Sequence, residues 1–363
     1  MLFQAICRQP IHAEWMVAAM STSAWTEWME NLMGAGSRQS YAATFLPGRF
    51  YCLLDELPLH LVPRSDSGGE PTGSETDSAL VLNSGCEFSA SGEIPRRFSD
   101  QPAVLEAFAL HGSIAWVADS AKQMILPYWI SPQLKIELDR LRAGQVTPAG
   151  LAEPLKKLLE QSEILISAVN REQRRSRWER KRDVGAVLFR ERGYAPIREL
   201  VHPFQVAALR RYYRHMIRTG AIQLGDGQSS RRYVAHNEPV ARYFHRQLAA
   251  VVSTIVGEPV KPSYVYVASY LAGAELPKHT DREQCEFSVT FCLDFSPEPV
   301  LETAWPIHLD TPGGDITVYQ ALGDGLVYRG TRVPHYRDPL SSNQTSTSIF
   351  FHYVAESFEG PLD

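Results

Sequence analysis

The pattern of apolar and polar positions changes character near residue 260. Before that point, apolar residues recur mainly at helical spacing. After it, short runs rich in Val, Ile, Tyr, Phe and Thr alternate with turns of Gly, Pro and Asp. The pattern therefore predicts an α+β chain with a β-rich C-terminal part.

Two segments between residues 200 and 260 have strong helical periodicity. Residues 203–218 place apolar side chains on one side of a helix, and residues 237–256 begin at Asn237-Glu238-Pro239 and end before Gly257. Another helix should end at Gly193 and lead into a strand. The strands expected after them are 264–271, 286–294, 304–309, 315–319, 325–328 and 346–354. This spacing is typical of a barrel or sandwich buttressed by helices.

The first 168 residues are predicted to form a mostly helical domain. A helix should start at Ser99-Asp100-Gln101-Pro102 and run through Leu110, and others should cover 132–141 and 148–159 before a short strand at 163–166. Helices that end in a short strand are also typical of a winged-helix-like, peptide-binding module. Residues 16–33 predict one or two amphipathic helices, and residues 64–78 predict a surface loop because they have almost nothing to bury.

A basic run at 170–183 separates the two parts. We interpret it as a solvated linker helix with Arg–Glu pairs, with binding to nucleic acid or an acidic partner as the alternative. The predicted division is 1–168 for recognition or oligomerisation, 169–183 for the basic linker helix, and 184–363 for catalysis. This division leaves open whether the chain forms a homo-oligomer.

Composition excludes several classes of protein. Of the 363 residues, 44% are hydrophobic and 21% charged, and the net charge of -5 gives no overall attraction to nucleic acid or membranes. No window approaches the ~20 apolar residues of a membrane span, and the first residues do not resemble a secretory signal. Five scattered cysteines without a CxxC pair favour reduced thiols and a cytoplasmic location.

The candidate chemistry lies at His279-Thr280-Asp281, followed 54 residues after Asp281 by His335. In an extended chain, residues i and i+2 point to the same side, so His279 and Asp281 can share a metal ion. His335 follows the predicted strand 325–328. Two imidazoles and one carboxylate are the facial ligand set of non-haem Fe(II) oxygenases, which leaves three coordination positions open.

The surrounding motifs resemble those of the Fe(II)- and 2-oxoglutarate-dependent oxygenases, in the prolyl-hydroxylase-like group. The resemblance covers about residues 184–354. It rests on Gly193-Tyr194 before a long helix, on Ser269-Tyr270-Leu271-Ala272-Gly273 before the HxD pair, on Gly323-Asp324-Gly325-Leu326-Val327-Tyr328 before His335, and on Ile349-Phe350-Phe351-His352-Tyr353.

The resemblance implies a double-stranded β-helix (a jelly-roll, cupin-like fold) with supporting helices. It also implies that His279, Asp281 and His335 hold Fe(II), and that Tyr270 contacts the co-substrate. 2-Oxoglutarate and O2 would be consumed, succinate and CO2 released, and ascorbate would serve as reductant in vitro. The substrate would be a small molecule or a peptidyl group that is hydroxylated at an unactivated carbon, with desaturation and bond cleavage as other outcomes of the same site.

One departure from the family pattern concerns the distal carboxylate of 2-oxoglutarate. The family usually holds it with Arg or Lys on the last strand, where this chain has Ser346, and no Lys or Arg occurs between 338 and 363. Arg337 is the nearest substitute, and Arg329 is the next. The alternative for Arg337 is a surface ion pair with Asp338 or Glu302.

Two other classes of function are weighed against an oxygenase. A cupin-like metal-binding or sensing protein without turnover would keep the three ligands and lack the anchor for 2-oxoglutarate. A nucleic-acid-binding regulator would act through residues 130–182, and the overall charge disfavours it. His308 and His352 are interpreted as structural or substrate-lining residues, and Cys285 and Cys292 as buried thiols.

Overall fold

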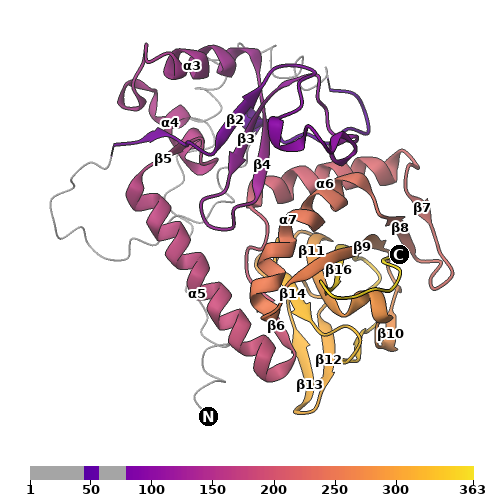
Figure 1. Ribbon diagram of the computed structural model, residues 1–363. Helices are drawn as coiled ribbons and strands as arrows, with labels where there is room; N and C mark the ends of the chain where they lie inside the picture. The colour runs from indigo at the N-terminus through magenta and orange to yellow at the C-terminus, as the bar shows by residue number, and fades with distance from the viewer. Residues whose placement is uncertain (1–44, 57–78) are drawn as a thin grey trace.

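The computed structural model describes residues 45–56 and 79–363, and Figure 1 shows the order of their elements. The helices predicted within 16–33 and the loop predicted at 64–78 lie outside these residues. Within the described ranges, no helix is both long and apolar enough to cross a membrane.

The N-terminal unit combines strands and helices. β2 (Cys86–Ser89), β3 (Ser113–Ala118) and β4 (Ile125–Ile130) form an antiparallel sheet, α3 (Pro132–Arg142) and α4 (Glu153–Gln161) follow it, and β1 (Val81–Leu82) pairs with β5 (Leu165–Ile166). The helices predicted at 132–141 and 148–159 and the strand predicted at 163–166 are therefore present, the second helix with a later start.

A mostly helical N-terminal domain is wrong for the described residues. The helix predicted from Gln101 to Leu110 is only a 3-10 turn, Pro102–Leu105, and the prediction missed β3 and β4. Both strands are buried on both faces over most of their length, so their apolar runs have no alternation. Periodicity alone does not distinguish such a run from a buried helix.

A single long helix, α5 (Ala168–Arg192), joins the two parts of the chain. Ser167 caps its start, and Gly193 ends it in the left-handed conformation with φ 78°. The predicted linker 169–183 is thus the first part of a helix that continues to β6 (Tyr194–Ile197). Helix and strand approach closely at Gly185, where a Cβ atom would lie 2.7 Å from the Ile197 side chain.

Two antiparallel sheets form the C-terminal unit. The larger has the order β6-β14-β11-β16-β9-β8-β7, and the smaller has the order β10-β15-β12-β13. Their strands are β7 (Gln223–Leu224), β8 (Arg232–His236), β9 (Val260–Tyr270), β10 (Leu276–His279), β11 (Phe287–Ser296), β12 (Ile307–Thr311), β13 (Gly314–Val318), β14 (Gly325–Tyr328), β15 (His335–Arg337) and β16 (Thr345–Ala355).

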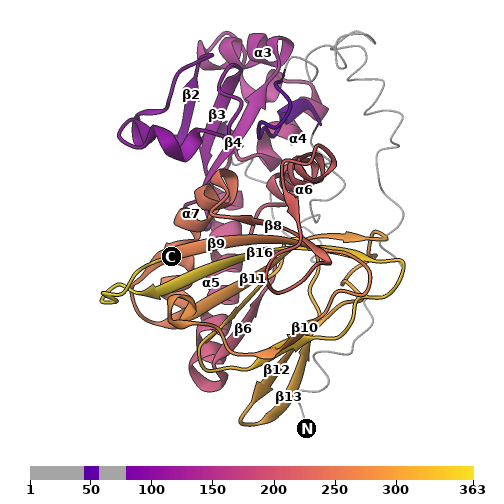
Figure 2. The same cartoon turned by 90° about the vertical axis from the view of Figure 1, so that its right-hand side faces the viewer.

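The connection of these strands is that of a double-stranded β-helix. In chain order from β9 to β16, the strands divide into two four-stranded layers, β14-β11-β16-β9 and β10-β15-β12-β13. Figure 2 shows the two layers above one another. Side chains of both layers meet between them, with Leu326 and Tyr328 of β14 packed against Ile307 and Leu309 of β12. The α+β class and all six strands predicted after residue 260 are confirmed.

Helices cover the other face of the large sheet. α6 (Pro203–Arg218) and α7 (Pro239–Val256) lie there with the end of α5, as Figure 1 shows. Their apolar sides join the outward residues of β9, β11 and β16 in one core. Both predicted helices are confirmed, although Glu238 rather than Asn237 caps α7.

The same core continues into the N-terminal unit. The Phe50 ring lies 5.9 Å from Tyr212 of α6 and 6.2 Å from Phe244 of α7, and it also contacts Trp129 of β4. The Tyr243 hydroxyl donates a hydrogen bond to the Ile125 carbonyl at 2.7 Å. The predicted division into domains stays a prediction, and any such domains share an apolar core.

Replacing Phe50 with alanine should therefore destabilise the whole chain. Phe50 is fully buried, and loss of a buried aromatic ring typically costs about 3–5 kcal/mol. Urea unfolding should show a fall of this size in the free energy of unfolding, within one cooperative transition. Val300→Ala, at a residue that is 97% exposed, should change it by less than about 0.5 kcal/mol. Two separate transitions, with only one displaced, would show that the units fold independently.

Candidate metal centre

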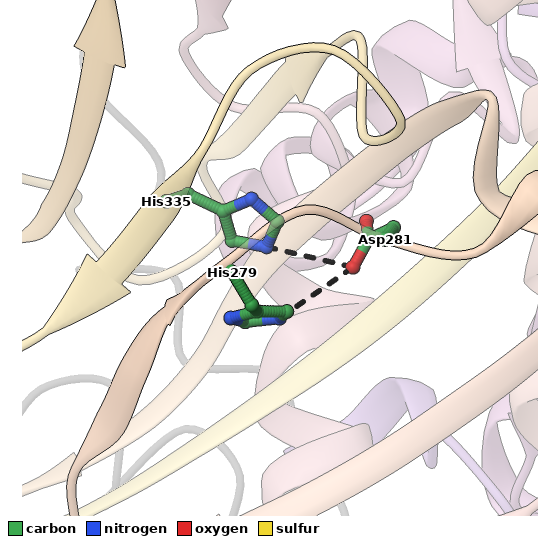
Figure 3. Close-up of side chains that lie close together, drawn as sticks. All are labelled: His279, Asp281 and His335. Carbon is green, nitrogen blue, oxygen red and sulfur yellow. Dashed lines mark ion pairs between the residues drawn. The ribbon is translucent and has the colours of Figure 1, made fainter.

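The pairing of two short strands brings the two histidines together. β10 and β15 are antiparallel, and His279 lies directly opposite His335 in their ladder. Asp281 follows two residues after His279, where its backbone N–H donates to the Gly330 carbonyl at 2.9 Å. The three residues predicted as ligands therefore converge on one point between the sheets, as Figure 3 shows.

The candidate ligand atoms are close enough to share one ion. The Nε2 atoms of His279 and His335 each lie 3.6 Å from Oδ1 of Asp281, and one ligand atom from each residue falls within 4.8 Å of the others. His335 is almost fully buried, whereas the His279 side chain is 38% exposed. The site is thus closed on one side and open to solvent on the other.

The hydrogen bonds of both imidazoles favour metal binding at Nε2. Nδ1 of His279 lies 2.7 Å from the Pro277 carbonyl, and Nδ1 of His335 lies 3.0 Å from the Val333 carbonyl. A carbonyl oxygen can only accept, so each Nδ1 carries the proton and each Nε2 keeps its lone pair. Burial lowers the pKa of His335, which also favours the neutral ring. The donor set fits a divalent transition metal with open positions.

A serine and a third histidine orient the carboxylate. The Ser288 hydroxyl donates to Oδ2 of Asp281 at 2.7 Å and lies 3.0 Å from Nδ1 of His352, its cross-strand partner. Because burial lowers the pKa of His352 to about 4, this ring is neutral near pH 7, and its Nδ1–H donates to Ser288. At Gly330 a Cβ atom would collide with Oδ2 of Asp281, so only glycine leaves room for the carboxylate.

Sequence reasoning missed Ser288 and Gly330. The alternation of β11 and β16 predicts which side chains face inward, and Ser288 and His352 both do. Alternation does not show that they lie opposite one another, because the register of the strand pair decides this.

Replacing Ser288 with alanine should weaken metal binding without removing a ligand. Partners that orient a metal ligand typically contribute 10- to 100-fold to affinity, so we expect a loss of about that size. Competition with a chromophoric chelator for Fe(II) or Ni(II) would measure it. Ser263→Ala is a matched control, since this hydroxyl donates to the carbonyl of Gln284, in the 3-10 turn that precedes β11. Equal affinities for the two variants would contradict the orienting role.

Arg337 lies inside the protein near the ligands. It follows His335 by two residues on β15, and both side chains are buried while Tyr336 between them is half-buried. The guanidinium lies 4.6 Å from the centre of the Trp305 ring and donates to the Trp305 carbonyl and to Gln320. Its pKa is lowered by burial.

The surface ion pairs considered for Arg337 do not form. Asp338 instead lies 3.3 Å from His308, and Glu302 pairs with Arg198. No carboxylate among the residues that the structure describes is within 4.0 Å of the Arg337 guanidinium. A buried cation without an anionic partner is costly, so the position has the properties of an anion site.

Tyr270 lines the same space from β9. Its ring is buried and meets Trp305 edge-on at 5.0 Å, so Trp305 contacts both Tyr270 and Arg337. A second interior cation, Arg232, reaches within 3.5 Å of the Tyr270 hydroxyl, but Asp226 already neutralises it at 2.6 Å. Sequence reasoning missed Arg232, whose strand β8 is only five residues long.

The structure places Arg329 away from the candidate ligands. Its guanidinium lies over the rings of Phe189 on α5 and Phe287 on β11, at 5.0 and 5.5 Å. These rings belong to the core on the helix side of the large sheet, whereas the preceding residue, Tyr328, faces the space between the sheets. Cys285 and Cys292 are buried thiols as predicted.

Solved structures of Fe(II)- and 2-oxoglutarate-dependent oxygenases match about half of the chain. The non-haem alpha-ketoglutarate dependent epimerase SnoN from nogalamycin biosynthesis shares 14% identity over 49% of this chain and 82% of its own, with a TM-score of 0.42. A prolyl-4-hydroxylase from Pseudomonas putida shares 16% identity over 47% of this chain and 98% of its own, with a TM-score of 0.39. An oxidoreductase of the 2OG-Fe(II) oxygenase family from Burkholderia pseudomallei shares 13% identity over 47% of this chain and 89% of its own, with a TM-score of 0.38.

No family model matches the chain, and no curated protein does. The side chains of the site are therefore the evidence for its function.

Proposed function

We propose that this chain is an Fe(II)- and 2-oxoglutarate-dependent oxygenase that hydroxylates an unactivated carbon and releases succinate and CO2. The observation that carries the proposal is the convergence of His279, Asp281 and His335, with both unprotonated Nε2 atoms 3.6 Å from one carboxylate oxygen. Two histidines and one carboxylate with open positions are the ligand set of non-haem Fe(II) oxygenases.

The proposed role of Arg337 is to bind the distal carboxylate of 2-oxoglutarate. Residues two apart on a strand face the same side and are about 7 Å apart at Cα. A five-carbon dicarboxylate held by the metal near His335 would extend along β15 toward this guanidinium. The missing anionic partner of Arg337 supports the role, because a carboxylate would offset the cost of burying the cation.

The remaining side chains would shape the reaction space. When bound, iron and 2-oxoglutarate supply the oxidising power for cleavage of an unactivated C–H bond. Tyr270 and Trp305 would line this space with aromatic rings and exclude water from it. The exposed edge of His279 is on the side by which a substrate would enter.

The substrate class we propose is peptidyl, amino-acid-derived or a specialised metabolite. The N-terminal unit adds residues beyond those that catalysis needs, and a role in recognising the substrate accounts for them. The alternative function is a cupin-like metal-binding or sensing protein without turnover. The absence of Lys and Arg from the last strand, β16, favours that alternative.

The decisive experiment is succinate release from 2-oxoglutarate by the full chain with Fe(II), O2 and ascorbate. An oxygenase should release succinate slowly even without its substrate, and His279→Ala should abolish this release. A chain that binds Fe(II) but neither binds nor consumes 2-oxoglutarate would support the sensing protein instead.

A further inference from the structure

A polar cavity of about 310 Å³ lies between the N-terminal unit, the first half of α5 and the segment that leads into α6. Its walls come from three segments, residues 119–122, 160–181 and 199–203. None of the three candidate metal ligands lines it. Figure 1 shows α5 beginning beside β5 and running along the molecule to β6, and the residues of α5 that line the cavity are in its half nearer β5.

The acidic residues of this cavity already have donors. Ser120 N–H and Arg174 hold the Glu163 carboxylate at 2.9 and 3.1 Å. The others are held in the same way: Asp119 by the backbone N–H groups of Ala121 and Lys122, Glu160 by Asn170, and Glu199 by Lys181. Each of these carboxylates therefore already accepts a hydrogen bond or ion pair from a donor of the protein itself.

Two cationic side chains of the cavity wall, Lys122 and Arg177, are not paired with these carboxylates. The Lys122 ammonium donates to the Glu199 carbonyl at 2.8 Å and lies 5.1 Å from the Trp178 ring centre, yet no carboxylate in the described ranges forms an ion pair with it. Arg177 makes neither a hydrogen bond nor an ion pair within the same ranges. Both cations remain available to a ligand.

His202 adds a neutral donor. The Phe204 N–H donates to Nδ1 of His202, so the proton of the ring is on Nε2, on its opposite side. His202 is 91% buried and lines the cavity, and Nε2 has no acceptor among the residues that the structure describes. The Nε2–H group is accessible from the cavity, so a bound anion would accept a hydrogen bond from it in place of water.

The backbone around the cavity is strained. Glu163 and Glu199 both line it, and both adopt left-handed conformations, with φ of 58° and 55°. Gln123, beside Lys122, does so as well, with φ of 61°. Non-glycine residues adopt this conformation rarely, and such strain gathers at binding sites because the surrounding structure must maintain it.

We infer that this cavity binds a small anion bearing a carboxylate or phosphate group, with Lys122 and His202 donating hydrogen bonds to it and Arg177 adding charge. The half of α5 that lines the cavity, residues 168–181, favours such a ligand, since it carries six Lys and Arg residues against two Asp and Glu. The inference does not depend on the proposed oxygenase function.

Calorimetric titration of the full chain with inorganic phosphate and with malonate tests the inference. All proteins would carry Arg337→Met, so that anions do not respond to the guanidinium near the metal centre. Lys122→Met removes the ammonium, and His202→Asn removes the Nε2 donor while asparagine can still cap α6. Lys135→Met, in a surface ion pair on α3, is the matched control.

At least one of the two anions should bind saturably, and the one that binds identifies the group that the site recognises. Lys122→Met and His202→Asn should each weaken binding about tenfold or more, because each removes a hydrogen bond to a charged group. Lys135→Met should leave the affinity unchanged. The inference is overturned if neither anion binds, or if Lys122→Met and His202→Asn, folded by near-UV circular dichroism, bind as tightly as the control.

Discussion

Replacing Asp281 with alanine should abolish tight binding of Fe(II) and, with it, consumption of 2-oxoglutarate. Asp281 is the only anion of the ligand set, and its Oδ1 lies 3.6 Å from both histidine Nε2 atoms. Loss of a partner that merely orients a ligand costs 10- to 100-fold in affinity, so loss of the ligand should exceed about 100-fold. Chelator competition would measure the affinity, and succinate release would measure the turnover.

The control for this variant is Asp310→Ala. Asp310 lies on β12 and pairs with Lys278 of β10 at 2.6 Å, where both side chains are well exposed. An exposed ion pair contributes at most about 1 kcal/mol to stability, so this variant should bind metal like the wild type. Retention of wild-type Fe(II) affinity by Asp281→Ala would refute the assigned ligand set, whatever the fate of turnover.

The ligands could be predicted from sequence because they depend on simple geometry. An i, i+2 pair on an extended segment places two side chains on one side, and this held for His279 and Asp281. The long strands β9, β11 and β16 were also recognisable, since their aromatic and β-branched residues recur with turns between them.

The strands that position the ligands could not be recognised from sequence. β10 has four residues including Pro277, and β15 has three. Neither contains enough residues to produce an alternating pattern. They exist because they pair with each other within the smaller sheet, which is information about tertiary structure. The position of His335 opposite His279 follows from that pairing alone.

Alternation does help to choose between the two arginines once the strands are known. On β14 the inward residues are Leu326 and Tyr328, so Arg329 must point toward the helices. On β15 the inward residues are His335 and Arg337. The sequence left the two arginines as alternatives because β15 could not be recognised, so the face on which Arg337 lies was unknown.

Arg337→Met should raise the concentration of 2-oxoglutarate needed for half-maximal succinate release by about 10- to 150-fold. This range follows from the roughly 1.5–3 kcal/mol that a hydrogen bond to a charged group contributes. Methionine keeps an unbranched apolar stem against Trp305, and the variant no longer buries an unpaired cation, so the fold should be retained. Thermal unfolding would verify this.

Two comparisons distinguish loss of the contact between Arg337 and the distal carboxylate from a general loss of activity. One compares two arginine variants, and the other compares two co-substrates. Arg329→Met removes the same charge on the helix side of the sheet and should leave the 2-oxoglutarate requirement unchanged. 2-Oxobutyrate has the same 2-oxo acid group but no distal carboxylate, so Arg337→Met should lose most of the preference for 2-oxoglutarate over it. If Arg337→Met keeps the wild-type preference, the distal carboxylate binds elsewhere, and Arg232, whose charge Asp226 already balances, becomes the next cation to replace.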